Sequence, residues 1–148
     1  SEKISILGNI IISAIGDEDL TLEDRIRQGI ERHFDFIAAN RDLPKFIVNE
    51  VLTRPDTIDM MKRNAQNIVN NLLNSLQQEI DAYAAKGLCR QVNARMLLID
   101  IVSLNVFPFM AAPIVLGAIG DSYNSYDEFL ALRKTENVET ILNKLKIH

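Results

Sequence analysis

The stretch Ile101–Gly120 reads IVSLNVFPFMAAPIVLGAIG and holds no ionisable side chain between Asp100 and Asp121. A surface helix of a globular domain normally shows one apolar stripe and one polar face. A helix that is apolar all round must instead be buried in a core, a membrane or a partner. The surroundings of this run therefore decide most of what the chain can do.

Two prolines, Pro108 and Pro113, lie inside the run. Each removes a backbone donor and bends a helix, so the carbonyls of Leu104 and Phe109 lose their usual helical partners. The bends either wrap the helix around its neighbours or leave a cavity. The cavity would face the second and fourth helices of the chain and would be lined by Leu104, Phe107 and Met110.

The composition is that of an ordinary globular chain, with 148 residues, 47% of them apolar and 24% charged. This length fits one domain over residues 1–148. The net charge of −4 has the wrong sign for a phosphate-binding surface, and no basic cluster is longer than Arg133–Lys134. Because Cys89 is single and Ser1 opens no secretory leader, a reducing cytoplasm is the expected location.

Apolar residues recur at helical spacing throughout, and no segment alternates with a period of two. The sequence therefore predicts an all-α, single helical bundle of about six helices. Capping residues and stop signals such as Gly87 place the ends of these helices. The expected helices are Glu2–Ile15, residues 22–40, residues 42–53 with Asp42 as cap and Pro44 in the first turn, residues 56–86, Asn93–Ile119 and Ser125–Lys146.

Motifs for catalysis and metal binding are absent from the sequence. The nearest approach to a di-iron motif is Glu31-Arg32-His33, whose spacing points the two candidate ligands apart. With two histidines and one cysteine, the chain has no set of four Cys and His ligands for zinc. It also has no nucleophile elbow or phosphate-binding loop. We expect no enzyme activity, no metal and no cofactor.

His33 falls on the apolar face of its expected helix. One interpretation is a boundary histidine that forms a hydrogen bond to a neighbouring helix. The other is a polar contact inside a ligand pocket. The fourth helix is expected to bury one apolar stripe, which consists of Ile58, Met61, Ala65, Ile68, Leu72, Leu76, Ile80 and Tyr83. Among the asparagines of this helix, Asn71 is next to the stripe and is the one expected to turn inward.

A bilayer is another environment that could cover the run. Twenty residues would just span the hydrocarbon core, but six of them are Ser, Asn, Pro or Gly and three are Ala. Both flanks are acidic, where a spanning helix usually has basic or aromatic anchors. A membrane span is therefore not expected. A helical protein that docks on a membrane or a membrane partner through residues 101–120 is the alternative function.

Several segments resemble the ligand-binding domain of TetR/AcrR-type transcriptional regulators. His33–Ile37, followed by Asn40–Ile47 with its Leu-Pro pair, is similar to the helix, turn and helix in the middle of that domain. Phe107–Pro113 resembles the penultimate helix of one branch of the family, and Phe129–Leu145 its last helix. The resemblance covers most of the chain from Leu22 onward.

The resemblance implies an effector-binding domain that forms a homodimer, with residues 1–20 as a connecting helix, 21–88 as ligand-binding helices and 89–148 as dimerisation helices. The last two helices would pair with those of a second subunit in a four-helix bundle. A small, largely apolar effector would bind to His33, Phe34, Ile37, Phe46, Met61, Ile68, Asn71, Leu72, Leu104, Phe107 and Met110. The dimer interface would hold Ile101, Pro108, Ala112, Val115, Leu116, Phe129, Val138, Ile141, Leu142 and Leu145.

The chain departs from the family at its start. Members carry an N-terminal helix-turn-helix domain of roughly fifty residues, and nothing in these residues can serve as one. Glu2–Ile15 would correspond to the helix that follows that domain. Binding to operator DNA is therefore expected only through an N-terminal domain not present in this chain.

Overall fold

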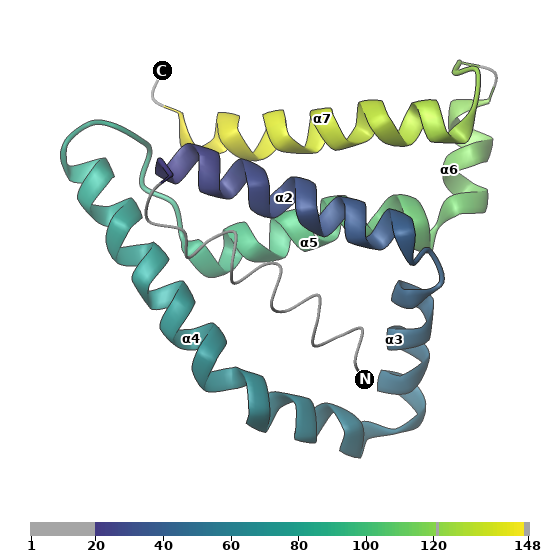
Figure 1. The fold of residues 1–148 in the computed structure, drawn as a ribbon, viewed down its shortest axis with the longest axis horizontal. Coiled ribbons are helices and arrows are strands. Elements are labelled where there is room, and N and C mark those ends of the chain that lie inside the picture. The colour runs from purple at the N-terminus through teal and green to yellow at the C-terminus, as the bar shows by residue number, and fades with distance from the viewer. Residues whose placement is uncertain (1–19, 121, 147–148) are drawn as a thin grey trace.

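The computed structural model describes residues 20–120 and 122–146 of the chain (Figure 1). This part contains no strand, so the predicted all-α class is confirmed. The predicted helix Glu2–Ile15 lies outside the described residues. The described helices are α2 (Leu22–Ala39), α3 (Leu43–Thr53), α4 (Pro55–Ala85), α5 (Ala94–Met110), α6 (Ala112–Ile119) and α7 (Tyr126–Leu145).

Three helices begin at a side chain that caps the first turn. The oxygens of Thr21, Asn93 and Ser125 accept hydrogen bonds from backbone N–H groups three residues later, at 3.1, 3.0 and 3.0 Å. At α7 the Glu128 carboxylate also accepts from the backbone N–H of Asn124 at 3.1 Å. These bonds satisfy donors that the helix itself leaves unpaired, which is why the predicted starts agree with the structure.

The start of α3 differs from the prediction in one respect. Asp42 occupies the cap position, but its side chain makes no capping hydrogen bond. Its backbone has φ −84° and ψ −10°, which is helical, whereas a capping residue normally has an extended backbone that aims its oxygen at the first turn. Pro44 does lie in the first turn, where its missing N–H costs no hydrogen bond.

The C-terminus of α4 is a Schellman motif. The N–H of Leu88 bonds to the carbonyl of Tyr83 at 2.9 Å, and the N–H of Gly87 bonds to that of Ala84 at 3.0 Å. Gly87 has φ +73°, a left-handed conformation that glycine adopts without a Cβ clash. The prediction that Gly87 terminates this helix is confirmed.

The predicted helix Asn93–Ile119 is instead two helices. α5 and α6 meet at Ala111 with an angle of 82° between them. Pro113 is in the first turn of α6, where a proline is well tolerated, so it starts a new helix rather than bending an old one. Pro108 remains inside α5, as predicted.

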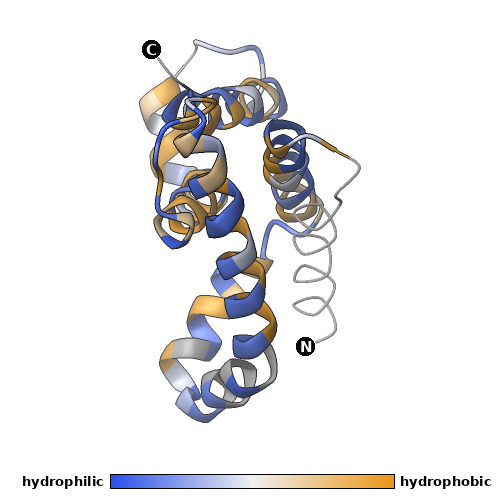
Figure 2. Ribbon diagram, turned by 90° about the vertical axis from the view of Figure 1, so that its left-hand side faces the viewer, coloured by the Kyte–Doolittle hydropathy of each residue, from blue (hydrophilic) through white to orange (hydrophobic). Residues whose placement is uncertain are grey.

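The helices α2, α5 and α7 pack pairwise on one another and lie side by side in Figure 1. α3 continues from the end of α2, and α4 returns from α3 to pack on α5. The junction of α3 and α4 projects away from the three-helix layer in both views, and Figure 2 shows hydrophilic and hydrophobic residues there. Ion pairs join α7 to its neighbours at the surface, Lys134 to Asp35 at 2.9 Å and Lys144 to Asp100 at 2.6 Å.

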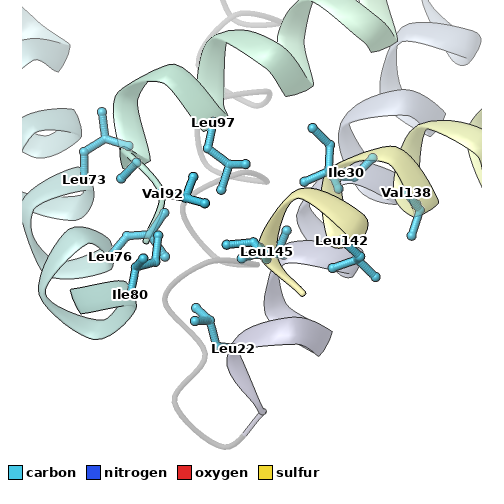
Figure 3. Packing of buried hydrophobic residues seen from close by; sticks show 13 residues of the cluster. Leu22, Ile30, Leu73, Leu76, Ile80, Val92, Leu97, Val138, Leu142 and Leu145 are labelled. Carbon is cyan, nitrogen blue, oxygen red and sulfur yellow. The ribbon is translucent and has the colours of Figure 1, made fainter. Parts of the chain in front are cut away.

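The main core lies where α2, α4, α5 and α7 meet. Figure 3 shows Leu97 of α5, Leu76 of α4 and Leu145 of α7 pointing into the same space. Burial of such side chains stabilises the fold by about 1.5–3 kcal/mol each. A second cluster holds Phe34, Ile37, Phe109 and Leu130, and the rings of Phe34 and Phe109 meet edge to face with centroids 5.4 Å apart.

The buried face of α4 is not the predicted one along its whole length. The prediction placed Ile68, Leu72, Leu76 and Ile80 on one stripe, but Ile68 is 54% exposed and Leu72 is only half-buried. Leu73 is buried together with Leu76 and Ile80. Among the described side chains of α4, those that belong to the core lie in its second half, from Val69 to Tyr83, where the positions nearest α5 decide the face.

We expect Ser125→Ala to lower the free energy of unfolding by about 1 kcal/mol, because the first turn of α7 loses its capping oxygen. Ser122→Ala is the matched control in the same exposed loop and should change it by less than about 0.5 kcal/mol. Urea denaturation of both variants measures the difference. Equal stabilities of the two variants would show that the cap is not needed for α7.

Candidate ligand cavity and its polar wall

A cavity of about 30 Å³ lies between α2, α4 and α5. A single water molecule needs roughly 10–15 Å³ of such space, so the cavity holds a small molecule or one end of a larger one. Its walls are apolar apart from one side chain, His33, among the described residues that line it. The lining residues are Ile26, Gly29, Ile30, His33, Leu73, Leu76, Ala94, Leu97, Leu98, Ile101 and Val102.

His33 is buried, with 3% of its surface exposed, and its imidazole Nδ1 lies 2.9 Å from the amide nitrogen of Asn105 on α5. Burial lowers the pKa of His33 from 6.5 to about 4, because the charged ring would lose its hydration. The ring is therefore neutral at pH 7. Both sequence interpretations of His33 describe a part of this arrangement, a bond to a neighbouring helix and a place in a cavity wall.

Asn105 and Asn137 extend this contact into a buried polar network. The amide nitrogen of Asn105 also donates to the carbonyl of Ile30 at 3.1 Å. Its amide oxygen accepts from the amide nitrogen of Asn137 at 3.0 Å. Asn105 is 0% and Asn137 1% exposed, so these bonds replace ones that water would otherwise supply. The network ties α2 to α5 and α5 to α7.

The network determines which ring nitrogen of His33 carries the proton. An amide nitrogen has two hydrogens, and those of Asn105 go to the Ile30 carbonyl and to Nδ1 of His33. The Ile30 carbonyl can only accept, which fixes the orientation of the amide. Nδ1 must therefore accept as well, and a neutral imidazole that accepts at Nδ1 carries its hydrogen on Nε2.

Asn137 also satisfies the carbonyl that Pro108 leaves without a partner. Its amide nitrogen donates to the Leu104 carbonyl at 3.2 Å, which confirms the prediction that this carbonyl lacks its helical bond. At the end of α5 the Tyr126 hydroxyl donates to the carbonyl of Pro108. Two side chains of α7, Asn137 and Tyr126, thus donate hydrogen bonds to carbonyls of α5 that lack a helical partner.

The structure brings few of the predicted ligand-binding residues to this cavity. His33 lines it, whereas Phe34 and Ile37 lie in the second cluster and Leu104 packs at the edge of the main core. Leu72 is half-buried outside the cavity wall, and the side chain of Met61 lies outside what the structure describes. Exposed side chains, and not cavity lining, are Phe46 at 48%, Ile68 at 54%, Phe107 at 57%, Met110 at 37% and also Asn71.

The composition of α5 explains why the cavity wall differs from the predicted one. Because α5 has no ionisable side chain from Ile101 to Met110, this part of its sequence does not indicate which face meets α2 and α4. The face that lines the cavity contains Leu97, Leu98, Ile101 and Val102, one to two turns earlier than the predicted Leu104, Phe107 and Met110.

The residues predicted for the dimer interface differ in how far they are buried in the single chain. Val138, Ile141, Leu142 and Leu145 are buried in the core of the single chain. Pro108 and Val115 are also buried, Ile101 lines the cavity, and Ala112 and Phe129 are half-buried. Leu116 is 46% exposed. The apolar stripe of α7 is real, but it packs on α2 and α5 of the same chain.

Large apolar side chains remain exposed around the bend between α5 and α6. Besides Phe107, Met110 and Leu116, Ile114 is 71% exposed. Single exposed apolar side chains are normal, whereas several that lie close together in the chain are of the kind found in contact surfaces. We call Phe107, Met110, Ile114 and Leu116 the bend surface.

A second cavity, of about 320 Å³, lies between the start of α2, the segment after α4 and the end of α7. Its walls include Leu22, Tyr83, Cys89, Leu142 and Lys146. Burial raises the pKa of the Cys89 thiol, so the thiol stays protonated at neutral pH. The sequence contained no signal for this space, since its walls come from three distant segments.

Two further observations concern metals and membranes. Within residues 20–120 and 122–146, no three His, Cys, Asp or Glu side chains lie close enough together to hold a metal ion. No single described helix has the length and hydropathy of a membrane span. α5 and α6 reach that length and hydropathy only when taken together, and they are bent by 82°.

Sequence reasoning missed Asn105 and Asn137. A signal was present for each, because Asn105 is the one amide in the uncharged run and Asn137 falls beside Val138 on the apolar side of its helix. Buried asparagines need hydrogen-bond partners, so two of them on neighbouring helices favour contact. Comparison with known proteins adds no relative: the chain matches no protein-family model, no curated protein and no solved structure.

Proposed function

We propose that this chain is the effector-binding and dimerisation domain of a TetR-like transcriptional regulator. A small, largely apolar molecule in the cavity between α2, α4 and α5 would change the operator affinity of an N-terminal DNA-binding domain. The proposal extends the resemblance of His33–Ile47, Phe107–Pro113 and Phe129–Leu145 to that family. It includes the expectations of a cytoplasmic location and of no enzyme activity, metal or cofactor.

One observation carries the proposal, namely that the uncharged run contributes to two different surfaces. Near its start, Ile101 and Val102 line the cavity. Near its end, Ile114 and Leu116 belong to the bend surface and are exposed. A ligand that moves the first part of the run can therefore shift the surface through which two copies meet, and such coupling is what an effector domain requires.

We expect the chain to sediment as a dimer at tens of micromolar and Leu116→Lys to convert it to a monomer. A lysine on the bend surface places a charge in a contact that excludes water. Leu88→Lys is the matched control, because Leu88 is 63% exposed on the loop between α4 and α5. Sedimentation equilibrium measures the mass of each variant, and circular dichroism shows whether each is folded.

A monomeric wild-type chain at these concentrations would count against the proposed dimer. Equal masses of the Leu116→Lys and wild-type chains would move the interface away from the bend surface. Vesicle flotation tests the alternative of membrane docking: binding of the wild-type chain that Leu116→Lys abolishes would favour that function for the same surface.

A further inference from the structure

We propose that the cavity between α2, α4 and α5 selects a neutral, largely apolar molecule with one hydrogen-bond acceptor, which the Nε2–H group of His33 holds. The inference rests on the proposed effector-binding function and names the chemical class of the effector. Ketones, aldehydes, esters and ethers belong to this class. Hydrocarbons, carboxylates and ammonium ions do not.

The cavity wall offers a ligand one polar side chain. His33 is the one polar side chain among the described lining residues, and its Nδ1 is already occupied by Asn105. Nε2–H is then the polar hydrogen that the ring has left for a molecule in the cavity. A ligand that brings an acceptor forms a bond there, whereas a ligand that brings only a donor finds no partner on the ring.

The cavity wall favours a neutral ligand over a charged one. No Lys, Arg, Asp or Glu is among the described residues that line the cavity, so an ionic ligand would lose its hydration without gaining a counterion. His33 cannot readily supply a positive charge. A second proton would have to go to Nδ1, where the Asn105 amide already donates at 2.9 Å, and two donors would then face each other.

The buried polar network holds the His33 donor firmly in place. Asn105 is itself oriented by the Ile30 carbonyl and by Asn137, and Asn137 is oriented by the Leu104 carbonyl. Four groups from α2, α5 and α7 therefore fix the tautomer of one imidazole. A preorganised donor loses little freedom when a ligand binds, so its hydrogen bond contributes to selectivity. The cavity volume of about 30 Å³ limits the part of the ligand that enters to a few heavy atoms.

The test titrates the full chain with four five-membered-ring probes: cyclopentanone, methylenecyclopentane of the same shape, cyclopentanecarboxylate and cyclopentylamine. We expect cyclopentanone to bind about fivefold to tenfold more tightly than the alkene, the ratio of one hydrogen bond. The charged probes should bind more weakly than either. Nitrogen-15 NMR of the imidazole should show the Nε2–H tautomer without ligand and a shift of that resonance with the ketone alone.

His33→Phe keeps a ring in the wall but lacks the donor, and it should bind the ketone and the alkene equally. If this variant does not fold, the wild-type imidazole resonance decides alone. Equal binding of ketone and alkene by the wild-type chain would overturn the inference while leaving an apolar effector site intact. Preferred binding of the carboxylate, or an Nδ1–H tautomer, would also overturn it. If none of the four probes binds, the inference is also overturned. Sedimentation tests the proposed dimer independently of this result.

Discussion

Asn105→Leu should lower the free energy of unfolding by about 2–5 kcal/mol, although leucine is close to asparagine in size and more apolar. Asn105 is fully buried and bonds to three groups. Its loss leaves Nδ1 of His33 and one amide hydrogen of Asn137 without partners in the core. Each unsatisfied buried group costs about 1–3 kcal/mol, which exceeds what the added apolar surface contributes.

Urea denaturation at pH 7 measures this effect. Asn67→Leu is the matched control, because Asn67 is exposed on α4, and it should change the stability by less than about 0.5 kcal/mol. The double variant Asn105→Leu/Asn137→Leu should lose at least about 1 kcal/mol less than the sum of the two single variants, since it removes both members of one bond. A loss below 1 kcal/mol for Asn105→Leu would show that the network does not stabilise the core.

Acidification should destabilise the wild-type chain through His33 by about 2–3 kcal/mol between pH 7 and pH 4.5. The pKa of His33 is about 4 in the folded chain and 6.5 in the unfolded chain. Between pH 6.5 and pH 4, His33 binds a proton in the unfolded chain but not in the folded chain. The unfolded state therefore gains stability relative to the folded state as the pH falls. Below about pH 4 both states are protonated and the loss stops growing.

The measurement is a series of urea denaturations from pH 7 to pH 4.5 on the wild-type chain and on His33→Phe. The other groups of the chain contribute equally to both proteins and cancel in the difference. His33→Phe is less stable at pH 7, because Asn105 loses an acceptor, and its stability should fall less steeply with pH. Parallel pH curves for the two chains would contradict a buried neutral His33.

Local features of the sequence predicted the helices well, because caps and stop signals act over three or four residues. Thr21, Asn93, Ser125 and Gly87 each mark a helix end that the structure confirms. The prediction that Pro113 bends a single helix was wrong. A proline is compatible with a bend inside one helix and with the first turn of the next, and only the packing of α6 distinguishes the two.

The candidate site was harder to predict because it depends on which faces meet. His33 could be singled out from its place on the apolar face of α2, and it does line the cavity. Asn105 and Asn137 are 32 residues apart in the chain, and their pairing follows from the contact between α5 and α7. The amphipathic stripe of α7 likewise showed that Val138 and Leu142 are buried, but not against which chain.

The sequence by itself determined that the run Ile101–Gly120 has no ionisable side chain on any face, that a proline inside it leaves a backbone carbonyl without its helical partner, and that the chain is helical. These properties are local, since hydropathy, capping and the missing proline donor belong to a few neighbouring residues. Only the tertiary structure decided that Asn137 serves the Leu104 carbonyl and that the run breaks at Ala111. The tertiary structure also decided that Ile101 lines a cavity and that Leu116 is exposed to solvent. A helix that is apolar on every side carries no preference of its own, so its neighbours assign each face.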